Sequence, residues 1–210
     1  MIRHSAFSIA AAVACMMLVS CASLTQQPEK QAPVPREPAG WAAEKQARQQ
    51  IENWEIRGRL GVQTESTGGT MDIIWKQSGD DFTIHLIAPL GAGSYLIRGE
   101  KGFAEIRFPD GEKKTVNNID DIFASALDVK LPASAIRDWI RGLPASALPV
   151  DQVKWNKQGL INRVKQAGWN VEMTRYTGAK TVLPHSIFVS RDDNDELDVR
   201  LILRQWLIDN

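Results

Sequence analysis

Residues 71–97, MDIIWKQSGDDFTIHLIAPLGAGSYLI, decide the fold of this chain. Large apolar residues occupy alternate positions on both sides of the turn sequence SGDD at 78–81. A period of two places these side chains on one face of a β-strand and the residues between them on the other. Strands with one dry and one wet face are typical of antiparallel sheets, so the stretch predicts consecutive antiparallel strands. The dry-face positions are Met71, Ile73, Trp75, Phe82, Ile84 and Leu86, and His85 falls on the wet face.

The same alternation recurs along the rest of the chain. Turn sequences such as STGG, PDGE, NKQG, TGAK and RDDND separate the alternating segments. We therefore expect about eleven strands, spaced roughly ten residues apart. The further dry-face positions are Trp54, Ile56, Leu60, Val62, Ala104, Ile106, Phe108, Trp169, Val171, Met173, Leu197, Val199, Leu201 and Leu203.

Helical patterns occur at two places. Residues 41–54 are rich in Ala, Gln, Glu and Lys, and Trp41, Ala47 and Ile51 recur at helical spacing, which predicts a helix with a thin apolar stripe. Residues 117–144 predict two short helices, the first capped by Asn118 and the second beginning near Pro132. A long sheet with one dry face must curl or be covered. We expect one mainly β domain over residues 41–210, a curved antiparallel sheet or open barrel wrapped around three helices.

The N-terminal part is typical of a lipoprotein precursor. Residues 1–20 contain a short positive region and the apolar segment AFSIAAAVACMMLV, which is too short for an ordinary membrane span. LVSC at 18–21 is the processing pattern that frees the amine and thiol of Cys21 for acylation, although secretion with a chance cysteine stays open as an alternative. Cys15 would leave with the signal, so no disulfide is expected. Residues 21–40 are Pro-rich and predict a tether of up to about 60 Å.

Charge and motifs exclude several classes of function. Removal of Arg3 with the signal leaves one more acidic than basic side chain, which argues against nucleic-acid binding. The histidines show no metal-ligand spacing, and no phosphate loop or nucleophile elbow is present. We expect a monomer without enzymatic activity, metal or cofactor, apart from the covalent N-acyl and S-diacylglycerol lipid on Cys21.

The large apolar side chains on the dry face allow two interpretations. They form either a solid core or the wall of a cavity, since barrels of about this size can hold one apolar ligand. Periodicity alone does not decide between them. The candidate acyl-cavity lining is Trp75, Phe82, Ile84, Leu86, Ile106, Phe108, Trp139, Ile140, Leu201 and Leu203.

Four sequence motifs suggest a family. RGRLGV, the stretch 73–97, IRDWIRGLP and TVLPHSI, on a chain with a lipidation site and tether, resemble the LolB family of outer-membrane lipoproteins. The resemblance covers residues 41–210 and implies an unclosed barrel with an apolar cavity, lidded by helices. It implies that the protein receives acylated lipoproteins from the periplasmic carrier LolA and releases them into the inner leaflet of the outer membrane. Ala22 fits sorting to that membrane, where the lipid on Cys21 would hold the protein at its periplasmic face.

The turn Pro89–Leu90–Gly91 places a leucine where a polar residue is usual. On pattern alone, Leu90 could fold back over the sheet edge, but the family resemblance implies a loop that inserts into outer-membrane phospholipid. One buried leucine contributes roughly 1.5–3 kcal/mol, which suits a role in release better than one in attachment. Two other interpretations remain: a structural or adaptor outer-membrane lipoprotein with a solid β core, and a periplasmic hydrolase of lipid or envelope polymer.

Overall fold

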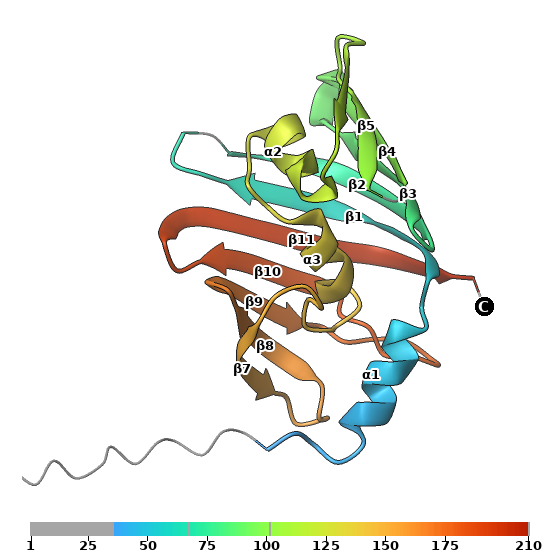
Figure 1. Ribbon diagram of the computed structural model, residues 1–210, viewed down its shortest axis with the longest axis vertical. Helices are drawn as coiled ribbons and strands as arrows, with labels where there is room; N and C mark the ends of the chain where they lie inside the picture. Colours follow the sequence, from blue (N-terminus) through green and yellow to red (C-terminus); the bar gives the residue numbers. More distant parts are fainter. Residues whose placement is uncertain (1–35, 67, 101, 210) are drawn as a thin grey trace, which may run out of the picture. The chain divides into compact units, whose positions relative to one another are not determined.

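A single antiparallel sheet of eleven strands organises the chain. The computed structural model describes residues 36–66, 68–100 and 102–209, and its sheet order is β6-β5-β4-β3-β2-β1-β11-β10-β9-β8-β7 (Figure 1). The two edge strands, β6 and β7, do not pair, so the barrel is unclosed, as predicted. The strands are β1 (Asn53–Gln63), β2 (Gly68–Ser78), β3 (Asp81–Ile87), β4 (Ser94–Glu100), β5 (Phe103–Arg107), β6 (Lys113–Val116), β7 (Val150–Trp155), β8 (Ile161–Gln166), β9 (Trp169–Thr174), β10 (Ser186–Arg191) and β11 (Asn194–Ile208).

The alternation predicted from the sequence places the core on the concave face. In β3, Phe82, Ile84 and Leu86 are buried, whereas the residues between them are partly exposed on the outer face. β9 and β11 show the same pattern. One long-range contact requires a glycine: a Cβ at Gly99 of β4 would lie 2.1 Å from the Phe82 ring. The dry face predicted for these strands is therefore the inner face of the barrel.

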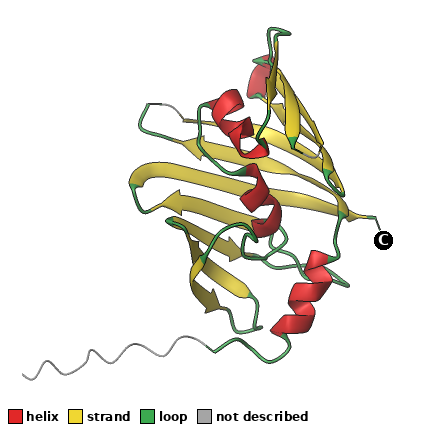
Figure 2. Cartoon of the chain, in the orientation of Figure 1, coloured by secondary structure: helices red, strands yellow, loops and turns green. Residues whose placement is uncertain are grey.

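Two short helices lie over the concave face (Figures 1 and 2). The 3₁₀ turn η2 (Ile119–Asp121) leads into α2 (Ile122–Leu127), and α3 (Ala133–Trp139) follows. Asn118 accepts a hydrogen bond from the Asp120 amide, which confirms its predicted capping role. Pro132 directly precedes α3, within one residue of its predicted place.

The first helix differs from its prediction. α1 spans Trp41–Gln49 and is followed by β1 at Asn53, so it is shorter than the expected 41–54. Ala47 is exposed, and Arg48 is fully buried in its place. The Arg48 guanidinium donates to the Val182 carbonyl at 2.6 Å and lies 5.7 Å from the Trp41 ring centroid. These contacts bury a charged side chain on the face where the sequence pattern predicts a thin apolar stripe.

The N-terminal predictions lie outside the described residues. These are the signal peptide, Cys21 and the part of the tether that precedes Arg36. Within the described part of the chain, no helix is long and apolar enough to cross a bilayer.

Candidate functional site: the concave interior and its open end

The ten residues of the candidate acyl-cavity lining lie in the concave interior. Nine of them are buried in one apolar cluster. The tenth, Phe108, is partly buried against this cluster, with its ring centroid 5.8 Å from that of Tyr95. In this conformation the nine serve as core side chains, covered by one another and by the helices. The nine are Trp75, Phe82, Ile84, Leu86, Ile106, Trp139, Ile140, Leu201 and Leu203.

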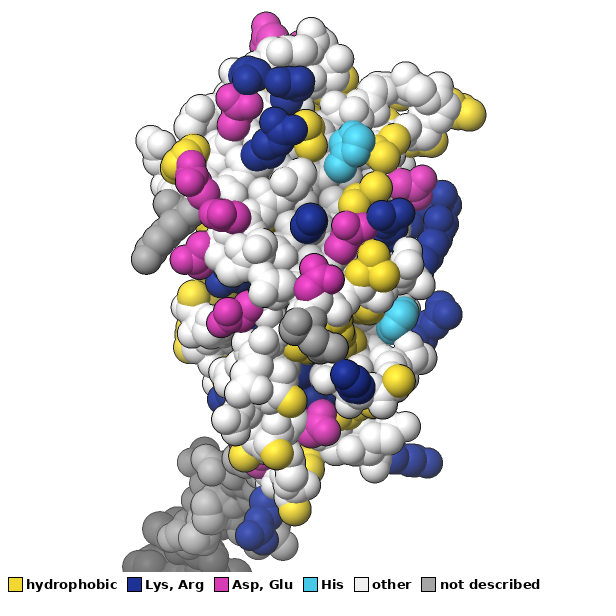
Figure 3. Space-filling model, turned by 90° about the vertical axis from the view of Figure 1, so that its right-hand side faces the viewer, with side chains coloured by type: hydrophobic (Ala, Val, Ile, Leu, Met, Phe, Trp, Pro, Cys, Tyr) yellow, Lys and Arg dark blue, Asp and Glu magenta, His cyan; other side chains and the backbone are white. Residues whose placement is uncertain are grey.

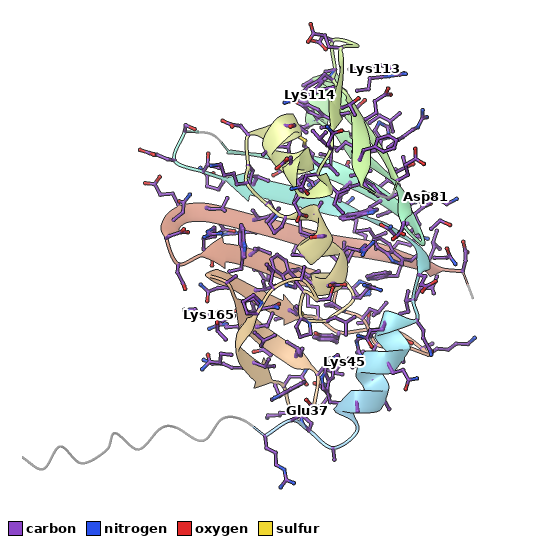
Figure 4. All side chains as sticks on the ribbon, viewed as in Figure 1. Glu37, Lys45, Asp81, Lys113, Lys114 and Lys165 are labelled. Atoms are coloured by element: carbon purple, nitrogen blue, oxygen red, sulfur yellow. The ribbon has the colours of Figure 1, made fainter. Side chains whose placement is uncertain are left out.

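Charged side chains lie mainly around the outside of the barrel. The lysines and acidic residues labelled in Figure 4 project from its periphery. Ion pairs there shift pKa values: the hydrogen bond from Lys165 lowers the pKa of Asp192, and the hydrogen bond from Arg200 lowers that of Asp198. Burial raises the pKa of Tyr176, a partly buried residue after β9 whose hydroxyl donates to the Ile161 carbonyl at 2.6 Å. Among the described residues, no group of His, Cys, Asp and Glu could hold a metal ion.

α3 is fixed to the sheet by buried polar contacts that sequence reasoning missed. The Trp139 indole donates to the Gln166 side chain at 3.2 Å, and the same amide bonds both backbone groups of Ala145. Arg141 donates to Asp138 and to the Ile51 carbonyl. The sequence contained a signal for Gln166, which alternates with Val164 on the dry face of β8. Asp138 and Arg141 are three residues apart, and Arg141 lies in the turn that follows α3.

α2 is held differently, and a small apolar hollow lies beside it. Ile122, Phe123 and Ala126 bury the inner side of α2. Its preceding turn is joined to α3 by Asp120, which accepts hydrogen bonds from the Ser134 amide and hydroxyl at 2.8 and 3.0 Å. The hollow measures about 160 Å³. It is lined by Leu60, Val62, Gly68, Gly69, Met71 and Leu127, the last residue of α2.

The loop that carries Leu90 lies at the same end of the sheet as this hollow. The last residue of β3, Ile87, pairs with Asp72, which is next to Met71 in the hollow. The Leu90 side chain is 105% exposed, so it does not fold back over the sheet edge. Its backbone is left-handed, with φ 56° and ψ 25°, a conformation that costs a non-glycine residue energy.

Neighbouring segments hold this loop, η1 (Pro89–Gly91), in place. The Ala88 amide donates to the Gly93 carbonyl, and the Ala92 amide donates to the Pro89 carbonyl. A Cβ on Gly93 would lie 2.5 Å from Pro109 in the β5–β6 turn. The apolar hollow and the fully exposed Leu90 therefore lie at the same end of the barrel.

Comparison with known proteins identifies the family. A family model described as outer membrane lipoprotein LolB matches residues 52–206, which is most of the chain and extends from the approach to β1 nearly to the end of β11. The chain belongs to the LolB family. The match contains the concave interior, both covering helices and the Leu90 loop. The family resemblance seen in the motifs is thus confirmed, and with it an outer-membrane lipoprotein of the Lol lipoprotein-localisation pathway.

Relatives in this family align with nearly the whole chain. An outer-membrane lipoprotein LolB from Halorhodospira halophila is 30% identical over 205 residues, covering 97% of this chain and 96% of the relative. Another from Nitrosococcus oceani is 31% identical over 167 residues, covering 79% and 82%.

Solved structures share the fold at low sequence identity. A LolA superfamily protein from Nitrosomonas europaea has a TM-score of 0.55 at 6% identity, covering 82% of this chain and 94% of that protein. A putative outer membrane lipoprotein-sorting protein domain from Vibrio parahaemolyticus has a TM-score of 0.51 at 12% identity, covering 80% and 91%. The unclosed barrel of this chain is therefore the fold seen in the LolA superfamily.

Proposed function

We propose that the chain accepts acylated lipoproteins from a LolA-like periplasmic carrier and inserts them into the inner leaflet of the outer membrane. The lipid on Cys21 holds the protein at the periplasmic face, and it works as a monomer without catalysis or a cofactor. The observation that carries this proposal is the position of Leu90, fully exposed at the end of the barrel where the apolar hollow lies.

The energetics of acyl chains support this role. Each buried CH₂ contributes about 0.8 kcal/mol, so lipoprotein acyl chains cannot cross water unshielded. Since the chain has no ATP-binding motif, transfer runs downhill: the acceptor binds the acyl chains more tightly than the carrier, and the bilayer binds them more tightly still. Aliphatic and aromatic contacts suit this order of affinities because they are non-directional and do not trap the cargo at one position.

Cargo entry requires space that the closed interior lacks, and α2 is the element whose movement provides it. The buried hydrogen bond from Trp139 to Gln166 fixes α3 to β8, and Arg141 ties the turn after α3 to Ile51. Apolar contacts and the Asp120–Ser134 link hold α2. α2 is capped at its C-terminus by Asp128, whose left-handed backbone (φ 58°) leads into the connection to α3. Displacing α2 removes Leu127 from the hollow and extends the hollow toward the buried wall of β1 and β2.

A charge placed in the hollow tests this route. We expect Met71→Glu to slow transfer of a radiolabelled lipoprotein from purified carrier to the full-length protein by about tenfold or more, because a carboxylate is costly to desolvate beside acyl chains. The control is Thr70→Glu, at the neighbouring exposed position on the other face of β2. Equal transfer rates for the two variants would contradict the proposed entry route.

The packed interior also favours the second candidate function, a structural or adaptor lipoprotein with a solid β core. Most of the candidate lining is less than 5% exposed. Binding of a fluorescent fatty acid to the full-length protein in detergent-free nanodiscs separates the two functions. Saturable binding that Met71→Glu weakens supports the acceptor, and absence of binding supports the solid core.

A further inference from the structure

The outer face of the barrel carries a transverse row of residues with an unusual composition. In register across β1 to β5, Arg57 lies opposite Ile74, Ile74 opposite His85, His85 opposite Leu96, and Leu96 opposite Arg107. The three central side chains are partly exposed. Because neighbouring strands lie about 4.8 Å apart, the row places Ile74 and Leu96, with His85 between them, in a centre about 10 Å wide between two guanidinium groups.

This row continues toward Leu90. Ile87 is two residues beyond His85 on β3 and therefore on the same outer face, about 7 Å away. The Leu90 loop begins directly after it. Leu90, Ile87, His85, Ile74 and Leu96, here called the outer strip, follow one another from the loop onto the outer face of the sheet, and Leu90 itself projects fully into solvent. Figure 3 shows hydrophobic side chains around a histidine in the upper part of this face.

Among the charged side chains beside the outer strip, Arg107 has a guanidinium that can bind a lipid phosphate. The nearby carboxylates are engaged in ion pairs, Glu55 with Arg57 at 2.6 Å, Asp72 with Arg59 at 3.3 Å and Glu105 with Lys113 at 3.0 Å. Arg107 is exposed and makes no ion pair with any described residue. A guanidinium at the edge of an apolar band suits the phosphate of a lipid headgroup.

The outer face of β8–β11 is occupied mainly by paired charges. On β8–β11, Arg163 pairs with Glu172 at 2.6 Å, Arg200 with Asp198 at 2.6 Å, and Lys165 with Asp192 at 2.7 Å. Phe188, partly buried on β10, lies opposite Glu172 and Arg200. Its apolar surface stands between charged neighbours and is not part of a continuous band.

We infer that the outer strip is a bilayer-contact surface. When Leu90 enters the leaflet, the domain tilts so that the outer face of β2–β4 rests on the membrane, with Ile87, Ile74 and Leu96 at headgroup depth and Arg107 against phosphate. This inference rests on the proposed insertion of Leu90, which it extends to an orientation of the domain. Residues 22–35, about 45 Å when extended, give the lipid-anchored domain enough reach for this contact.

Site-specific labelling tests the orientation in the intact protein. Cys15 leaves with the signal and the thiol of Cys21 is acylated, so a single introduced cysteine takes the label and the wild-type chain should take none. L90C, L96C and F188C are each labelled with an environment-sensitive fluorophore. The lipidated proteins are reconstituted in vesicles of phosphatidylethanolamine and phosphatidylglycerol (about 7:3), and quenching by lipids bearing a nitroxide is measured. H85C repeats the test if L96C unfolds at lower urea concentration than wild type.

The labelled positions separate the outcomes. We expect quenching at positions 90 and 96 to exceed that at position 188 at least threefold. If position 90 is quenched but quenching at position 96 equals that at position 188, the outer strip does not contact the bilayer, although the Leu90 loop still inserts. Absence of quenching at both 90 and 96 would overturn loop insertion as well.

Discussion

Leu90→Glu should reduce insertion of cargo lipoproteins into liposomes by at least tenfold, while the variant remains folded and still accepts cargo from the carrier. Burial of one leucine contributes roughly 1.5–3 kcal/mol, and each 1.4 kcal/mol corresponds to about a factor of ten. A carboxylate in its place adds a desolvation cost. The side chain makes no buried contact, so the substitution should leave folding stability within about 0.5 kcal/mol of wild type.

A matched variant, Leu207→Glu, shows whether the effect on cargo insertion depends on the position of the introduced charge. Leu207 is 41% exposed and lies in register with Glu55, near the opposite end of the sheet. Leu207→Glu introduces the same charge and should leave insertion unchanged. The measurement is the rate at which radiolabelled lipoprotein enters liposomes that already contain the acceptor. Normal insertion by Leu90→Glu, or equal loss in both variants, would refute the role assigned to the loop.

Trp139→Ala should destabilise the folded chain by about 3–5 kcal/mol. The Trp139 side chain is fully buried, packs 6.0 Å from the Trp169 ring and donates its indole hydrogen to Gln166. Truncation therefore leaves a cavity and removes one partner of a buried amide. Trp139→Phe keeps most of the packing and loses the hydrogen bond, so a smaller cost of about 1–3 kcal/mol is expected.

Urea unfolding of the full-length protein measures both variants. We expect both variants to unfold at a lower urea concentration than wild type, and Trp139→Ala to unfold at a clearly lower concentration than Trp139→Phe, because Trp139 fixes α3 to the sheet. If Trp139→Ala unfolded at the wild-type urea concentration, Trp139 would contribute a cavity wall with little packing, and the assignment of α3 as the fixed helix would be wrong.

The strands and their inner face were predictable because period-two alternation is local and strong. Phe82, Ile84 and Leu86 are buried as expected, and Asn118 caps its turn. The end of α1 was not predictable, since Ile51 extends the helical pattern although it is buried beyond the helix. Glu44 lies four residues before Arg48 and pairs with it, but the burial of Arg48 was not predictable, because the Val182 carbonyl that its guanidinium also contacts is 134 residues away.

The site was predictable in part. Alternation identifies which side chains face inward, but whether they touch each other or enclose a space depends on where α2 and α3 pack. The loop that carries Leu90 passes close to Pro109 at Gly93, and Pro109 belongs to a different hairpin. The outer strip requires the register of β2, β3 and β4, so no single strand of the sequence contains it.

Photo-crosslinking during transfer shows directly whether cargo acyl chains enter the barrel. A benzophenone amino acid replaces either Met71, on the inner face beside the apolar hollow, or Thr70, the exposed neighbour on the other face of β2. Each full-length variant receives lipoprotein with radiolabelled acyl chains from the purified carrier and is then irradiated. We expect crosslinks to the acyl chains from position 71 and few or none from position 70. Crosslinks from position 70 alone, or from neither position while transfer proceeds, would contradict it.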